Sequence, residues 1–339
     1  MAADAARDRV APMEPQSDTG IVPQAPQRRG ILDGLDESAE RFARASKSPN
    51  TARSYDRAWR SFAEWCRSRG EAAMPASPAC VANYVAARAE AGRKTATIQV
   101  DVAAIRQAHL LAGERTPTDD PQVAAVMGGV RRVVGARPDA KDAAMPDQIA
   151  AFVAALGSGL AGDRDRAMIL LGFAGAFRRS ELVALRVEDV AFERGDAAVV
   201  VSIRRSKTDQ TGLGLDTVVH ATRGPNCPVA ALRAWMAASG VESGPLFRPV
   251  RNGAVSSERS LRPAAVAEAV KRAAAAAGMD SSRYAGHSLR AGFVTAATAA
   301  GVPLQDIMGV THHRKADTAL GYVRRGAKDS PDISSKLGL

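Results

Sequence analysis

Two strand-like segments stand out in a chain whose apolar residues otherwise recur at helical spacing. Residues 199–203, Val-Val-Val-Ser-Ile, are mostly β-branched and predict a strand, and residues 217–220 are its expected partner. A polar turn that contains glycine separates the two, which favours antiparallel pairing. The remaining pattern is helical, so we expect a mainly α protein with a small antiparallel β-sheet.

The helical pattern begins after Ser48, the expected cap of a helix whose first turn holds Pro49. One apolar face follows at three- and four-residue spacing, formed by Tyr55, Trp59, Phe62 and Cys66. Further helices are expected at 78–91, 95–112 and 120–134. Residues 41–134 therefore predict an all-helical domain.

A polar segment with Pro138 inside it predicts an interdomain linker over residues 135–146. A second, mostly helical domain is expected over 147–339. It opens with a helix at Asp147 and a buried helix over 167–174, and its later helices are expected at 228–239, 263–277, 286–299 and 303–308. Residues 1–40 are rich in proline and lack apolar periodicity, so we expect a disordered tail there.

The net charge of +10 is unevenly distributed over the 339 residues. Residues 1–40 carry four arginines against eight acidic residues, a net charge of −4, which leaves +14 on the remainder. A basic body of this kind suits a polyanion, most simply nucleic acid. On charge alone, an inert basic surface is an equally good interpretation.

Other features of composition indicate the compartment. The three cysteines are scattered and odd in number, which is typical of reduced thiols in a cytoplasm and not of a disulfide framework or a zinc cage. No apolar run is long enough to span a membrane, and the N-terminal segment does not resemble a secretory signal. We expect a cytoplasmic protein that needs no metal and no cofactor.

An ordered set of reactive side chains predicts attack on a phosphodiester. Tyr322 follows His313 by nine residues, and a His287-Ser288-Leu289-Arg290 segment and Arg178 lie upstream. A phenol has a pKa of about 10 and is a poor nucleophile by itself. Guanidiniums bind phosphate oxygens through a planar fork, and imidazoles transfer protons. The set therefore combines a nucleophile with the groups that would activate its target.

Each of these residues has an ordinary structural interpretation when taken alone. A tyrosine near a C-terminus usually packs, Lys207 suits any exposed turn, and Glu181 suits a helix surface. His312 and His313 form a pair, but no carboxylate or cysteine stands at metal-ligand spacing beside them. Only the ordered set in a basic chain favours catalysis.

The chain resembles the tyrosine recombinase (phage integrase) family over roughly residues 45–330. The resemblance is carried by residues 174–182, by Arg205-Ser206-Lys207-Thr208, by Gly286-His287-Ser288-Leu289-Arg290, and by the interval from His313 to Tyr322. Segments at 62–66, 97–113 and 246–253 look most like those of Cre recombinases. The family commonly has glycine immediately before the last histidine, where this chain has His312; the nine-residue interval selects His313.

The resemblance implies a SAM-like, helical core-binding domain and a C-terminal catalytic domain that ends in an oligomerisation segment. It implies that Tyr322 forms a 3′-phosphotyrosyl link and that Lys207 protonates the leaving 5′-oxygen. The non-bridging oxygens would be bound by Arg178, Arg290 and His313. His287 would transfer a proton, and Glu181 would orient the site.

Contacts to DNA are expected at two places. The helix start after Gly92 offers Arg93, Lys94, Thr95 and Thr97 to phosphates, although a solvated helix start explains each of them equally well. Near the catalytic residues, the candidates are Arg179, Arg204 and Arg205.

The resemblance implies a site-specific recombinase that cleaves and rejoins duplex DNA without metal or ATP. Its partners would be DNA with inverted binding arms and further copies of the chain, as a dimer on one site and a tetramer in synapsis. Two alternatives remain open: a type IB topoisomerase and a non-catalytic DNA-binding protein of the same fold.

Overall fold

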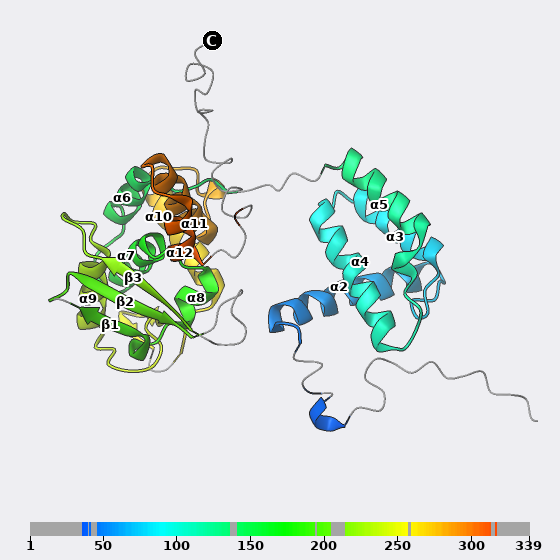
Figure 1. The fold of residues 1–339 in the computed structure, drawn as a ribbon, viewed down its shortest axis with the longest axis horizontal. Helices are drawn as coiled ribbons and strands as arrows, with labels where there is room; N and C mark the ends of the chain where they lie inside the picture. Colours follow the sequence, from blue (N-terminus) through cyan, green and yellow to red (C-terminus); the bar gives the residue numbers. More distant parts are fainter. Residues whose placement is uncertain are drawn as a thin grey trace, which may run out of the picture. The chain divides into compact units, whose positions relative to one another are not determined.

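The computed structural model describes residues 36–39, 41, 46–135, 141–193, 195–204, 214–256, 259–312 and 316. The chain divides into two compact units, Met1–Pro138 and Asp139–Leu339, and each is described by itself (Figure 1). Residues 37–39 are helical, whereas the sequence predicts a disordered tail over 1–40; most of that tail lies outside the described residues. No helix in the described ranges is long and apolar enough to cross a membrane.

The first unit contains the helices expected from the sequence. They are α2 (Pro49–Ser68), α3 (Pro78–Glu90), α4 (Thr95–Leu111) and α5 (Pro121–Val133), with a short 3₁₀ turn, η1 (Pro117–Asp119), before α5. Proline stands in the first turn of α2, α3 and α5, and each of these helices is capped by the side chain of the preceding residue, Ser48, Ser77 or Asp120. Helix α2 packs on α4 and α3 on α5.

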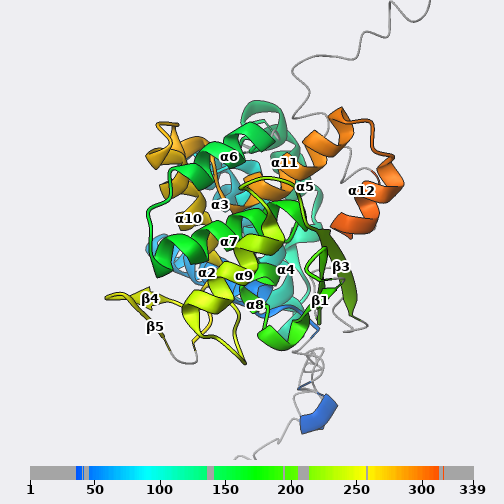
Figure 2. The same ribbon diagram turned by 90° about the vertical axis from the view of Figure 1, so that its left-hand side faces the viewer.

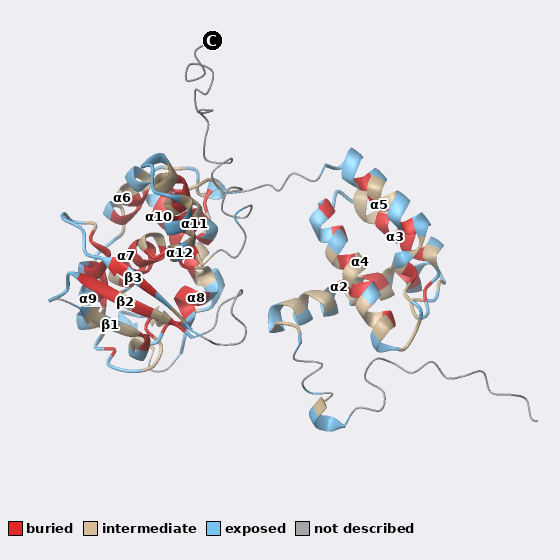
Figure 3. Cartoon of the chain, in the orientation of Figure 1, coloured by how far each residue is buried: buried red, intermediate tan, exposed pale blue. Residues whose placement is uncertain are grey.

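The second unit is built around α7 (Leu160–Ala174), which is largely buried (Figure 3). Its neighbours are α6 (Pro146–Ala154), α8 (Arg179–Ala184), α9 (Pro228–Ser239), α10 (Pro263–Ala276) and α11 (Gly286–Ala299). Helix α12 (Leu304–Thr311) packs on α11. Two 3₁₀ turns, η2 (Val187–Asp189) and η3 (Ser281–Arg283), precede β1 and α11.

A three-stranded antiparallel sheet covers one side of this unit, with the order β1 (Val190–Glu193), β2 (Ala198–Ile203) and β3 (Leu215–His220) (Figure 2). The predicted pair is β2 and β3, and Val200 lies opposite Val218. Strand β1 was not expected, because its four residues are too few to show a clear alternation. A further hairpin joins β4 (Val250–Arg251) to β5 (Ala254–Val255).

Candidate active site

Arg178 and Glu181 form a buried pair at the start of α8. Glu181 accepts the backbone N–H of Arg178 through Oε2 at 2.8 Å and the Nη1 of the same arginine through Oε1 at 2.6 Å. The two side chains are 13% and 2% exposed. A carboxylate three residues into a helix normally caps its N-terminus, and here it also fixes the guanidinium. Glu181 thus lies where an orienting residue is expected.

The turn between α7 and α8 delivers Arg178 to this position. Ala176 has a φ of +49°, a left-handed conformation that is uncommon for alanine. A Cβ on Gly175 would lie 2.2 Å from the Phe177 ring, so only glycine fits there. This turn leaves Arg178 at the N-cap of α8.

Arg290 reaches the same turn from α11. Its side chain is buried at 2% exposure, and its Nη1 donates to the Ala176 carbonyl at 2.7 Å. Its Nη2 donates to the carbonyl of Thr311, the last residue of α12. Arg290 thereby joins the α7–α8 turn to the C-terminal end of α12.

His287 and Arg179 lie near the start of α11. His287 is exposed and stands one turn before Arg290 on the same helix. A Cβ on Gly286 would lie 2.3 Å from the Cδ of Arg179, so the aliphatic part of Arg179 packs over this glycine. The contact brings the beginnings of α8 and α11 together.

His312, which the sequence sets aside in favour of His313, lies within this group. It ends α12 in the left-handed region, with φ 51° and ψ 41°, the conformation that glycine adopts most readily. Its Nε2 lies 3.0 Å from the Oγ1 of Thr217 on β3. No motif marks Thr217 as part of the site, because its hydroxyl contacts a residue 95 positions away.

The electrostatic surroundings of His312 show which groups converge. Burial lowers the pKa of its imidazole below the ordinary value, Glu181 opposes that effect, and Arg290 and Arg178 add to it. Two guanidiniums and one carboxylate therefore act on a single ring. This local excess of positive charge suits a phosphate, because guanidinium stays charged and binds two oxygens at once.

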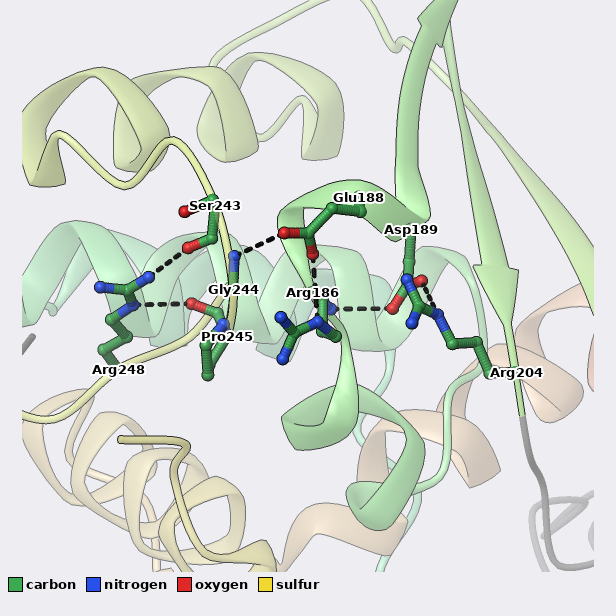
Figure 4. Close-up of polar contacts among 8 residues, drawn as sticks. All are labelled: Arg186, Glu188, Asp189, Arg204, Ser243, Gly244, Pro245 and Arg248. Carbon is green, nitrogen blue, oxygen red and sulfur yellow. Dashed lines mark hydrogen bonds and ion pairs between the residues drawn. The ribbon is translucent and has the colours of Figure 1, made fainter. Parts of the chain in front are cut away.

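Arg204 lies at the end of β2, at the base of the segment that contains Lys207. Its Nε donates to the buried Asp189 at 2.5 Å, and the other carboxylate oxygen accepts the backbone N–H of Arg186 at 2.9 Å (Figure 4). Arg204 was expected to contact DNA. Its side chain is 60% exposed, and the ion pair also gives it a structural role.

The predicted contacts on α4 differ from one another. Arg93, Lys94 and Thr97 are exposed around the start of the helix. Thr95 is only 4% exposed and its hydroxyl donates to the Gly135 carbonyl at 2.6 Å. The structure gives Thr95 a contact that fastens the end of this unit in place of the predicted contact with DNA.

Four predicted site residues lie outside the described residues: Arg205, Lys207, His313 and Tyr322. Arg205 and His313 directly follow the described residues Arg204 and His312. Among the described residues no group of His, Cys, Asp and Glu is arranged to hold a metal ion.

Residues 144–328 match the phage integrase family, and residues 42–112 match the phage integrase N-terminal SAM-like domain. The chain belongs to the phage integrase family. A Selenomonas ruminantium protein described as an integrase/recombinase XerD homolog is 34% identical over 297 residues, which make up 86% of each chain. The chain is therefore a tyrosine recombinase, an enzyme of site-specific DNA recombination.

Solved structures of family members share the fold. The Tn1549 transposon integrase in complex with a circular intermediate DNA has a TM-score of 0.60 at 15% identity, over 89% of this chain and 96% of that one. A lambda integrase dimer bound to a core site has a TM-score of 0.59 at 15% identity, over 88% and 78% of the two chains. The predicted fold class, a helical SAM-like domain followed by a mostly helical catalytic domain with a small sheet, is confirmed.

Proposed function

We propose that Tyr322 is the nucleophile of this recombinase. Its phenolic oxygen forms a bond to the scissile phosphorus while the bond to the 5′-oxygen breaks, which leaves a 3′-phosphotyrosyl link and a free 5′-hydroxyl. The phenolic proton passes to His287, and the leaving oxygen takes its proton from Lys207. The reverse reaction with another 5′-hydroxyl joins the exchanged strands, so neither metal nor ATP is needed.

Arg178, Arg290 and His313 bind the non-bridging oxygens of the phosphate in this proposal. The observation that carries it is the buried arrangement around His312, where two guanidiniums from separate elements meet beside one carboxylate. Charges held in place before reaction stabilise a transition state without reorganisation. The hydrogen bonds of Arg178 and Arg290 to Glu181 and to two carbonyls provide that support.

We also propose the following arrangement on DNA. Residues 41–134 form a core-binding domain, 135–146 a linker, and 147–339 a catalytic domain with a C-terminal oligomerisation segment. Phosphates are contacted by Arg93, Lys94, Thr97, Arg179, Arg204 and Arg205. Two copies bind the inverted arms of one site in the bacterial cytoplasm, and two sites join as a tetramer, as the Cre-like segments suggest.

Covalent trapping tests this function. DNA that flanks the gene is footprinted to find the bound site, and a duplex nicked within that site is then incubated with the protein. The nick lets the short 5′-hydroxyl fragment diffuse away, so the covalent complex accumulates. We expect the adduct with the natural protein and none with Tyr322→Phe; Tyr284→Phe, which changes another phenol of the same unit, is the matched control.

Two further results distinguish the alternatives. A type IB topoisomerase would also form the adduct, but it would relax plasmids that lack the footprinted site and give no recombinant product. A non-catalytic DNA-binding protein would give a footprint and no adduct. An adduct that survives Tyr322→Phe would show that the nucleophile is another residue.

A further inference from the structure

Part of the predicted linker packs on the second unit. Residues 141–144, here called the anchor segment, lie beside the start of α11. The backbone N–H of Asp142 donates to the Arg283 carbonyl at 2.8 Å, and that of Ala144 donates to the Ser288 carbonyl at 3.0 Å. Arg283 ends η3, and Ser288 lies in the first turn of α11. The anchor segment therefore contacts both sides of the turn that leads into this helix.

Side chains add to the backbone contact. The Asp142 carboxylate forms an ion pair with the Arg283 guanidinium, and the Nζ of Lys141 donates to the Ser282 carbonyl at 2.7 Å. The Arg283 and Asp142 side chains are 57% and 39% exposed, so their pair contributes little to the stability of the fold. Because the same two residues also meet through their backbones, the pair holds the anchor segment against one particular turn.

A glycine lets α11 approach the anchor segment closely. Ala144 is fully buried, and a Cβ on Gly292 would lie 1.8 Å from the Ala144 carbonyl oxygen and 2.7 Å from its carbonyl carbon. Gly292 stands four residues after Ser288, so the two lie on one face of α11. Ala144 therefore contacts this helix at two successive turns.

The first turn of α11 depends on such contacts. The first N–H groups of a helix have no partner within it, and helix ends fray when nothing else holds them. The Oγ of Ser288 accepts the backbone N–H of Ala285 at 3.0 Å, while its carbonyl accepts the N–H of Ala144. His287, the second residue of the helix, is exposed beside it. Ser288 thus joins the anchor segment to the turn that carries His287.

Arg290 is held from other elements. Its guanidinium is buried and donates to the carbonyls of Ala176 and Thr311. These contacts lie one turn further along α11 and involve no residue of the anchor segment. A displaced anchor segment should therefore shift His287 more than Arg290.

We infer that the anchor segment positions His287 for proton transfer, through the Asp142–Arg283 pair and the hydrogen bond from Ala144 to Ser288. The inference rests on the proposed function, in which His287 takes the phenolic proton of Tyr322. The anchor segment touches neither the phosphate nor the phenol in this assignment, so its residues act through the imidazole.

Reversal of charge tests the ion pair. Asp142→Arg and Arg283→Asp each place like charges together, and each should slow single-turnover adduct formation about fivefold at saturating protein, the upper range for a half-exposed pair. The double variant restores opposite charges and should restore the rate. Arg233→Asp breaks a similarly exposed pair with Asp196 in the same unit and is the matched control, with an unchanged rate expected. Unchanged rates in both single variants, or no recovery in the double variant, would overturn the inference.

A double-mutant cycle shows whether the effect passes through His287. His287→Gln should slow adduct formation, and adding Asp142→Arg to it should cause no further loss. A full further fivefold loss would overturn the positioning role and leave the proposed function intact, since a loss of folded protein slows both backgrounds equally. If His287→Gln is as fast as the natural protein, the proton-transfer role of His287 fails, and the role of the anchor segment fails with it. Thermal unfolding of each variant shows whether it is folded.

Discussion

Both units bury an arginine–carboxylate pair, and the pairs differ in what surrounds them. In the first unit, Arg88 on α3 donates to Asp101 on α4 at 2.9 Å and lies over the ring of Tyr84. In the second, Arg178 and Glu181 belong to one helix start and stand beside Arg290 and His312. The first pair fastens two helices together. The second stands at a helix start, where another guanidinium, Arg290, and the His312 imidazole lie close by.

One histidine in each unit, His109 and the half-buried His312, shows the same difference. His109 is fully buried, with Nδ1 at 2.8 Å from the Ile105 carbonyl and Nε2 accepting the backbone N–H of Ala76 at 3.0 Å. Both ring nitrogens are thus committed to the main chain. His312 instead forms a hydrogen bond with the Thr217 hydroxyl, and the charges of Glu181, Arg290 and Arg178 act on its ring. A polar group that the backbone satisfies supports the fold, whereas one set among unbalanced charges supports a ligand.

Substitution of the two arginines should give the largest contrast. Lysine retains the charge but loses the planar fork, so Arg178→Lys should slow adduct formation about 10³-fold and change the melting temperature little. Arg88→Lys should lower the melting temperature and leave the rate of adduct formation unchanged. Single-turnover trapping measures the rate of adduct formation, and thermal unfolding measures the melting temperature. An equal loss of rate in Arg178→Lys and Arg88→Lys would contradict the proposed difference between the two pairs.

The two units also differ in the space around one helical glycine in each, Gly292 and Gly129. A Cβ on Gly292 of α11 would lie 1.8 Å from the Ala144 carbonyl oxygen, so Gly292→Ala must displace backbone. Overpacking of this kind destabilises by about 1–3 kcal/mol, and α11 carries Arg290, so cleavage should fall as well. Gly129 of α5 is exposed with nothing within 4 Å of its Cβ position, and Gly129→Ala should stabilise by about 1 kcal/mol. Chemical denaturation compares them; destabilisation by Gly129→Ala would contradict the expectation.

Much of the fold could be predicted because local signals agree with it. Proline in the first turn and a capping side chain before it locate the starts of α2 and α3 within a residue. The β-branched run gives β2 in the same way. Strand β1 has no such local signal, since it forms by pairing with β2.

The site could be predicted only in part, since motifs identify residues and not their contacts. The intervals select Arg178 and Arg290, but the hydrogen bond from Arg290 to Ala176 joins residues 114 positions apart. The left-handed position of the α7–α8 turn is held by an alanine, Ala176, so the residue type does not predict its conformation. Thr95 shows the opposite case, where a polar residue at a helix start suggested a ligand contact and the structure buries it against Gly135.

The smallest expected effect is a pH dependence of opposite sign in the two units. Burial raises the pKa of Asp101 above its ordinary value of 3.8, against the opposing effect of Arg88. Between 3.8 and the raised pKa, the folded protein holds a proton that the unfolded chain has lost. The free energy of unfolding of the first unit should therefore fall as the pH rises through that window.

The titration of His312 should give the free energy of unfolding the opposite pH dependence. Its pKa lies below the ordinary 6.5, so between the two values the unfolded chain binds a proton that the folded protein does not. The stability around His312 should fall as the pH drops below 6.5 through the folded pKa. Hydrogen exchange of the amides in α4 and in β3, corrected for intrinsic rates, measures the pH dependence of stability around Asp101 and around His312 in one experiment. Asp101→Asn should remove the first dependence alone and His312→Gly the second alone; a shared sign in both units would show that other groups control the titration.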